Sequence, residues 1–168
     1  KEYLAHIEED ATGTEFALMV DVLTTNKTSF FREDEHFKFL RESVLPGLVA
    51  GGREIRVWSA AGSSGEEPYT LAMVIAGMLE RQELSRVKIL ATDISTRMIE
   101  KARAGRYGAE QVRDVPAQLL QTHFTRTGLG AAAVHVVGRE LRSFVRFAKL
   151  NLMEAWPMQG PFDIVFCR

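Results

Sequence analysis

Residues 56–73 read RVWSAAGSSGEEPYTLAM, and this stretch decides the fold. The apolar run EIRVWSA at 54–60 predicts a buried strand, and EEPYTLAMVIAGMLERQ at 66–82 has apolar residues at helical spacing. A glycine-rich turn joins the two, which makes half of a βαβ unit. VKILATD at 87–93 predicts a second buried strand. STRMIEKAR at 95–103 predicts another helix, with Ser95 or Thr96 as its N-cap. This alternation of strand, helix, strand and helix predicts an α/β fold with a parallel, doubly wound sheet.

The flanking segments predict how the chain is divided. TEFALMVDVL at 14–23 has apolar residues at helical spacing and precedes a polar connector, and residues 26–106 are expected to form the first part of the α/β core. A further helical pattern at 34–45 is expected to end where Pro46 interrupts it. Short runs with glycine turns over 107–149 predict a small antiparallel β insert. Residues 150–168, ending in FDIVFCR, are expected to continue the core with one more parallel strand.

Composition excludes several classes of protein. The chain has 168 residues, 21 basic and 22 acidic side chains and a net charge of −1, which is ordinary for a globular domain. The single cysteine, Cys167, excludes an internal disulfide, and no apolar run approaches the ~20 residues of a membrane span. Cys167 lies in a predicted strand and is expected in the core. Without an internal disulfide or a membrane span, we expect a cytoplasmic location. The four histidines lack the spacing of metal ligands, so we expect no metal.

The glycine turn at 62–65 indicates which ligand the sheet holds. It lacks the Lys-Ser/Thr pair of a P-loop and does not fit G-x-G-x-x-G, which disfavours a nucleotide phosphate. In an open parallel sheet this turn and Asp93 would be neighbours at the carboxyl ends of the strands. Asp93 could accept hydrogen bonds from a ribose diol, and Glu66 or Glu67 could accept one from a cationic amine. S-adenosylmethionine fits that description.

Structural roles compete with this interpretation. Acidic residues in the first turn of a helix often only complement its dipole, and an aspartate after a strand is often a cap or turn residue. The three features in this order on this scaffold favour the ligand site.

Five motifs in sequence order carry a family resemblance: LTTNKTSFFRE (23–33), RVWSAAGSSGEEPYTLAM (56–73), ILATDIS (89–95), NL (151–152) and FDIVFCR (162–168). Together they resemble the CheR-type chemotaxis receptor methyltransferases, which transfer a methyl group from S-adenosylmethionine to receptor glutamates. The resemblance implies a Rossmann-like methyltransferase sheet that is incomplete in this chain. It also implies that residues 1–25 are the end of an N-terminal helical domain and its linker. Further strands and a site tyrosine are expected beyond residue 168.

The resemblance also implies a set of cofactor contacts. Arg32 is expected near the reacting end of the cofactor, as the catalytic residue, while Asp93 binds the ribose and Asn151 with Leu152 borders the adenine. The full implied set is Asn26, Thr28, Arg32, Glu66, Asp93, Asn151, Leu152 and Arg168. A surface ion pair with Glu33 or Glu35 is the alternative role for Arg32.

Residues 103–149 are unusually basic, with eight basic and three acidic side chains and a net charge of +5. The resemblance favours a docking surface for the cytoplasmic domain of a receptor, with a solvated face as the alternative. The window lacks the aromatic series of single-strand binders, so we expect no nucleic acid as a partner. Because no apolar run is long enough to span a bilayer, we also expect no direct membrane insertion. The basic residues are Arg103, Arg106, Arg113, Arg126, Arg139, Arg142, Arg146 and Lys149.

The sequence therefore predicts a protein-glutamate O-methyltransferase that releases S-adenosylhomocysteine. A methyltransferase acting on another substrate and a non-catalytic S-adenosylmethionine-binding signalling module remain as alternatives.

Overall fold

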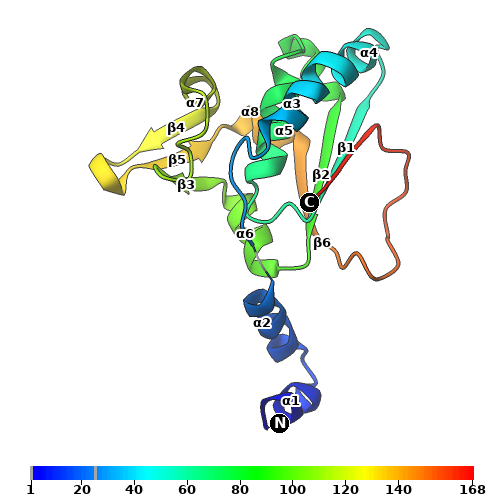
Figure 1. Ribbon diagram of the computed structural model, residues 1–168, viewed down its shortest axis with the longest axis vertical. Coiled ribbons are helices and arrows are strands. Elements are labelled where there is room, and N and C mark those ends of the chain that lie inside the picture. Colours follow the sequence, from blue (N-terminus) through cyan, green and yellow to red (C-terminus); the bar gives the residue numbers. More distant parts are fainter. Residues whose placement is uncertain (1, 25) are drawn as a thin grey trace.

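A parallel four-stranded sheet forms the centre of the protein in the computed structural model, which describes residues 2–24 and 26–168 (Figure 1). Its strand order is β6 (Val145–Lys149), β2 (Val87–Asp93), β1 (Ile55–Ala60) and β7 (Ile164–Cys167). Every neighbouring pair is parallel. Because β2 and β6 extend from one side of β1 and β7 returns to the other, the order reverses between β1 and β7. This confirms the predicted α/β class and places a topological switch point beside β1.

The main hydrophobic core lies on one face of this sheet. Helix α5 (Glu66–Ala76) contacts β2 and β6, as do α6 (Thr96–Ala104) and α8 (Arg139–Phe144). The predicted helix at 66–82 ends earlier than expected, and the 3₁₀ segment η2 (Arg81–Arg86) follows. At the start of α6, the Ser95 hydroxyl accepts a hydrogen bond from the Met98 amide, which is the predicted N-cap.

The other face of the sheet is covered by the segment 150–163, which arches away from the helices in Figure 1. Trp58 from β1 packs edge-on against Trp156, with ring centroids 4.9 Å apart, and lies 5.7 Å from Phe162. This smaller aromatic cluster fixes the loop that begins with Asn151 and Leu152.

The helical segment at 34–50 differs from its prediction. Helix α3 (Asp34–Phe39), the π-helical turn η1 (Leu40–Val44) and α4 (Leu45–Ala50) follow one another directly, so Pro46 does not end the helix. The Leu45 amide bonds to the Leu40 carbonyl, five residues back. Such a π-turn widens the helix directly ahead of Pro46, which has no N–H to donate to the preceding turn.

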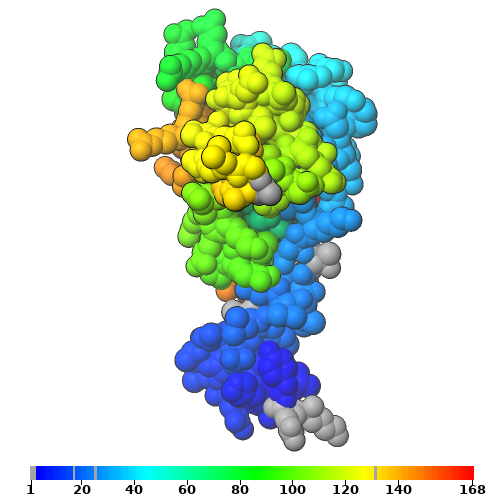
Figure 2. Space-filling view, turned by 90° about the vertical axis from the view of Figure 1, so that its left-hand side faces the viewer, coloured from blue at the N-terminus to red at the C-terminus, as the bar shows by residue number. Residues whose placement is uncertain are grey.

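A second, antiparallel sheet forms the insert, with the order β3 (Arg106–Gly108), β5 (Val134–Val137) and β4 (Phe124–Thr127). Helix α7 (Ala117–His123) and the short 3₁₀ turn η3 (Gly130–Ala132) connect its strands. Figure 2 shows this insert as a lobe on the surface of the core. We use "insert" below for residues 106–138.

The predicted insert, 107–149, extended too far. Residues 139–144 form α8, and β6 pairs in parallel with β2, from Ile89 opposite Val145 to Asp93 opposite Lys149. An alternating apolar strand can pair in either direction, so the sequence pattern alone does not distinguish the two sheets.

This boundary changes the charge assignment. The insert has three basic side chains, Arg106, Arg113 and Arg126, and two acidic ones, Glu110 and Asp114. Its net charge is therefore only +1. The remaining basic residues of the window lie on α6, α8 and β6.

Cys167 also differs from its prediction. It is exposed, because β7 lies at the edge of the described sheet and only its inward-facing residues, such as Ile164, enter the core.

Two helices precede the core, α1 (Glu2–Glu9) and α2 (Thr14–Leu23), and they protrude from it (Figure 2). Large apolar side chains on them are exposed, among them Phe16 and Val22. Within residues 2–24 and 26–168, no helix has the length and hydropathy needed to cross a membrane.

Candidate functional site

A cavity of about 340 Å³ opens at the carboxyl ends of β1 and β2, next to the switch point. This volume lies within the range of small-molecule sites, ~300–1,000 Å³. The connector 26–33, the glycine turn after β1, the end of β2 and the start of the 150–163 segment all contribute to its wall. Seven of the eight predicted site residues line it: Asn26, Thr28, Arg32, Asp93, Asn151, Leu152 and Arg168.

Backbone conformations that side chains rarely adopt gather around this cavity. Four non-glycine residues of the described chain have positive φ: Phe31 (53°), Glu33 (57°), Ala61 (61°) and Ser63 (48°). Ala61 and Ser63 line the cavity, and the other two flank Arg32. Such residues persist only where their surroundings hold them, and they concentrate at functional sites.

Asp93 fixes the glycine turn and faces the cavity. One carboxylate oxygen accepts a hydrogen bond from the Ser63 amide at 2.8 Å, and the other accepts one from the Ser95 amide at 2.9 Å. Only 7% of the residue is exposed. Since each carboxylate oxygen has a further lone pair, Asp93 can also accept from two neighbouring hydroxyl groups of a ligand. The structural role proposed as an alternative and the ligand role are therefore compatible.

Glu66, which the resemblance places in the cofactor pocket, does not line this cavity, whereas its neighbour Glu67 does. The Glu67 carboxylate accepts from the Ser59 hydroxyl at 2.7 Å and from Arg168 Nε at 2.7 Å. Glu66 is 3% exposed and accepts from the Ser64 hydroxyl at 2.7 Å, and burial raises the pKa of its carboxyl. Consecutive helical residues point about 100° apart, so only one of the two can face the ligand.

Arg168 joins the separate walls of the cavity. Besides its bond to Glu67, its Nη1 donates to the Arg32 carbonyl at 2.8 Å and to the Glu33 carboxylate at 3.0 Å. The pKa of Glu33 is lowered, chiefly because Arg168 donates this hydrogen bond to it. The connector before α3 is thereby held against the start of α5.

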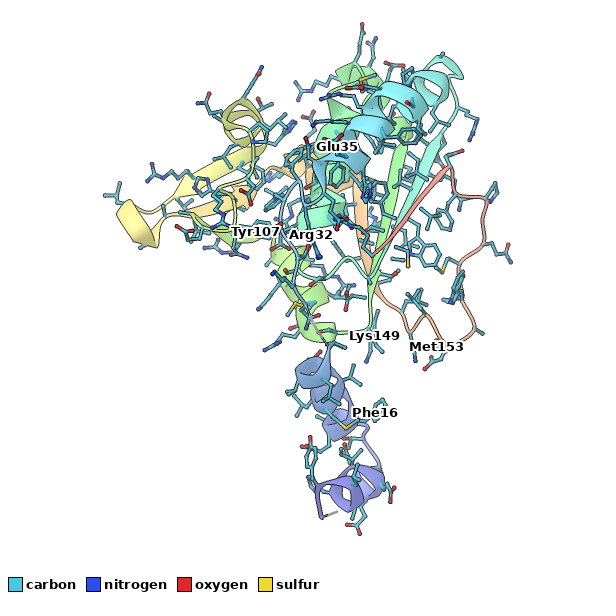
Figure 3. All side chains as sticks on the ribbon, in the orientation of Figure 1. Phe16, Arg32, Glu35, Tyr107, Lys149 and Met153 are labelled. Carbon is cyan, nitrogen blue, oxygen red and sulfur yellow. The ribbon has the colours of Figure 1, made fainter. Side chains whose placement is uncertain are left out.

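Arg32 lies near the junction of the core and the insert, where Tyr107 also lies (Figure 3). Its Nη1 donates to the Lys27 carbonyl at 2.9 Å, which turns the guanidinium along the connector. Among the described residues no carboxylate forms an ion pair with Arg32, and Glu33 pairs instead with Arg168 and His36. The geometry thus does not support the surface ion pair with Glu33 or Glu35 as its role.

The opposite end of the cavity is more open. Asn151 Oδ1 accepts from the Met153 amide at 3.0 Å, and its Nδ2 donates to Glu154 at 2.9 Å, so the side chain shapes a turn. Leu152 is 36% exposed and offers an apolar surface. Asn26 closes the other side, where its carbonyl accepts from the Ser63 hydroxyl at 3.4 Å. An apolar wall with amide groups beside it suits a flat heterocycle.

Sequence reasoning missed several lining residues, namely Lys27, Ser63, Ile94 and Leu150. Lys27, Ile94 and Leu150 each adjoin a predicted site residue, and Ser63 lies in the glycine turn. Their position next to the motifs is the sequence feature that could have identified them. Within the described residues, no group of three or more His, Cys, Asp or Glu side chains is arranged to hold a metal ion.

Comparison with known proteins identifies relatives along the whole chain. Residues 26–168 match the family model described as "CheR methyltransferase, SAM binding domain". A "Chemotaxis protein methyltransferase" of Escherichia coli is 42% identical over 168 residues, covering 99% of this chain and 57% of that protein. A protein of the same description from Borreliella burgdorferi is 38% identical, covering 99% and 60%. A "Probable chemotaxis protein methyltransferase" of Rhizobium etli is 36% identical, covering 100% and 64%. The chain thus spans about three fifths of the length of these relatives.

Proposed function

The chain belongs to the CheR methyltransferase family, and from this premise we propose that it transfers a methyl group from S-adenosylmethionine to glutamate side chains of chemotaxis receptors. The family model is named for S-adenosylmethionine binding, and the relatives are named as methyltransferases of chemotaxis. Glutamate as the acceptor group, the receptor as substrate and S-adenosylhomocysteine as product are the finer parts of the proposal.

One observation carries the assignment: the cavity presents Asp93 at one wall and the Glu67–Arg168 pair at another. Asp93 can accept from the ribose hydroxyls, Glu67 can accept from an ammonium group, and Arg168 or Arg32 can donate to a carboxylate. Mixed charges of this kind suit an amino-acid zwitterion joined to a nucleoside. The residues present therefore fit S-adenosylmethionine.

The residues at the reacting end would act by positioning. The bound cofactor supplies an electrophilic methyl group on a sulfonium. A glutamate side chain is ionised at neutral pH, since its ordinary pKa is about 4.3, and it needs no general base. Its oxygen would bond to the methyl carbon, and the electron pair of the broken C–S bond would remain on sulfur. Arg32 would orient the attacking carboxylate, because aligned reactants can gain ~7–11 kcal/mol.

The receptor is proposed to dock on the insert and the basic residues near it. Arg126 on β4 and Arg139 at the start of α8 are exposed on neighbouring elements, which suits an acidic partner. A cytoplasmic location follows from this proposal, because the substrate glutamates lie on the cytoplasmic helices of receptors.

Transfer of labelled methyl from S-adenosylmethionine to a panel of receptor cytoplasmic fragments tests the proposal in the full-length protein. Label on the receptor that mild base releases as methanol is expected, because methyl esters hydrolyse whereas N-methyl groups do not. Base-stable label on another molecule would assign a different substrate. Binding of S-adenosylhomocysteine without any transfer would instead indicate a non-catalytic signalling module.

A further inference from the structure

The insert reaches beneath the glycine turn through Tyr107. This residue belongs to β3, is 1% exposed and donates its hydroxyl to the Ser64 carbonyl at 2.8 Å. Its ring packs edge-on against Phe30 of the connector, with centroids 4.9 Å apart. A Cβ on Gly65 would lie 2.7 Å from the Tyr107 hydroxyl oxygen, so the turn rests directly on this side chain.

A second contact joins the insert to the same turn. Gln111 Oε1 accepts from the Gly108 amide at 3.0 Å, which fixes its orientation, and Nε2 donates to Glu66 at 3.3 Å. The other Glu66 oxygen accepts from the Ser64 hydroxyl at 2.7 Å. Tyr107 and Gln111 therefore bind the two ends of the segment 64–66, at Ser64 and Glu66. Neither side chain lines the cavity.

We propose that Tyr107 and Gln111 are positioning residues, by which the insert keeps the glycine turn in the conformation that binds the cofactor. The proposal rests on the function proposed above for this cavity. It gives the insert a role in cofactor affinity that is separate from any docking of a partner.

Backbone strain is the physical reason that the turn needs such support. Ala61 and Ser63 both have positive φ, and the Ser63 amide must point at Asp93 for the cavity to keep its shape. If the supporting bonds are lost, the free protein can populate relaxed turns. The observed affinity for the ligand is then the intrinsic affinity multiplied by the fraction of free molecules that have the competent turn.

The substitution Tyr107→Phe tests this, with Tyr69→Phe as the matched control. Tyr69 is also 1% exposed and donates its hydroxyl to a backbone carbonyl, that of Ala102 at 3.0 Å, but not to the glycine turn. Tyr107→Phe is expected to weaken S-adenosylhomocysteine binding roughly three- to tenfold, the range for one hydrogen bond. The KM for S-adenosylmethionine should rise equally while kcat changes less than twofold, because the bound complex re-forms the turn. Tyr69→Phe should change both constants less than twofold.

If Tyr107→Phe does not fold, variants at exposed glutamines test whether the insert positions the glycine turn. Gln111→Ala is expected to weaken S-adenosylhomocysteine binding about two- to threefold, whereas Gln118→Ala, an exposed glutamine on α7, should leave it unchanged. Equal affinity for Tyr107→Phe and Tyr69→Phe, or for the two glutamine variants, overturns the positioning role. Absence of S-adenosylhomocysteine binding by the unmodified protein would instead overturn the function proposed for the cavity.

Discussion

The glycine turn at 62–65 and the insert at 106–138 adjoin each other, yet they are built in opposite ways. In and around the turn, polar side chains are buried: Ser59, Glu67 and Asp93 are at most 7% exposed. They are also hydrogen-bonded, Ser59 to Glu67 and Asp93 to the amide of Ser63 in the turn. In the insert, α7 has no buried residue, and three of the four residues of β4 are exposed. In the described part of the insert only glycines have positive φ. In and beside the glycine turn, Ala61 and Ser63 have positive φ although they are not glycines.

The difference matches the two proposed tasks, ligand binding at the turn and partner docking on the insert. A small ligand needs donors and acceptors fixed within a fraction of an ångström, and this region holds strained backbone with long-range bonds. A docking surface needs exposed area and charge, which many sequences can supply. Substitutions in the two regions should therefore differ in kind as well as in size.

The largest expected effect contrasts two glycines of positive φ. At Gly65 (φ 99°) an added Cβ would lie 2.7 Å from the Tyr107 hydroxyl oxygen and 2.9 Å from Ala102 Cβ. Gly65→Ala should lower the free energy of unfolding by roughly 2–5 kcal/mol through strain and overpacking. Gly130→Ala in the insert has the same kind of φ (57°) but no atom within 4 Å, and should cost about 1–2 kcal/mol. Urea unfolding measures both, and equal losses would break the contrast.

The next effect concerns two aspartates whose carboxylates both accept hydrogen bonds from backbone amides. Asp93→Ala should weaken S-adenosylhomocysteine binding by roughly 1.5–3 kcal/mol in calorimetry, the range for a hydrogen bond to a charged group. Asp163 is the control, because its carboxylate also accepts a backbone amide, that of Arg56 at 2.8 Å, away from the cavity. Asp163→Ala should lower stability while it leaves affinity unchanged. Unchanged affinity in Asp93→Ala would remove this residue from the site.

Arg32 should show an effect on rate more than on binding. Arg32→Ala is expected to lower kcat on receptor by about ten- to a hundredfold, because aligning the attacking carboxylate is its proposed role, with a smaller loss of S-adenosylhomocysteine affinity. Arg41→Ala, an exposed arginine paired with Glu42, is the control and should alter neither. Equal losses of rate and affinity for Arg32→Ala would reassign the residue to general cofactor anchoring.

The smallest effect is expected on the insert. Arg126→Glu should reduce receptor methylation a few-fold at low salt, with S-adenosylhomocysteine affinity intact, because complementary charge mainly speeds encounter. The defect should disappear toward ~1 M salt, where the screening length falls to about 3 Å. Arg146→Glu, on β6 of the core sheet, is the control of equal charge change. If the two variants behave alike, the insert has no particular role in docking.

Much of the fold could be predicted from sequence because its signals are local. The strands at 54–60 and 87–93 and the Ser95 cap follow from apolar runs and one hydroxyl placed before a helix. The partner of 145–149 could not be predicted, since its alternating pattern serves either sheet. The passage through Pro46 depends on a π-turn, which the sequence does not indicate.

The candidate site could be predicted by motif but not by orientation. Asp93 and Arg32 lie where the motifs indicate, because each follows directly from a strand end or a short connector. Which of Glu66 and Glu67 faces the cavity depends on how α5 is rotated about its axis. That rotation is set by the packing of the helix against its neighbours. The support from Tyr107 and Gln111 joins positions more than 40 residues away in sequence, which no local pattern reveals.

The three bonds of Arg168 also bear on how the protein folds. They reach back 101, 135 and 136 residues, to Glu67, Glu33 and Arg32, so this part of the cavity closes only after β7 has paired with β1. Contacts of such sequence separation form late and slowly. Binding of S-adenosylhomocysteine during refolding should therefore appear only with the slowest phase. At a hundredfold excess over its Kd, the same ligand should add about 2.7 kcal/mol to global stability.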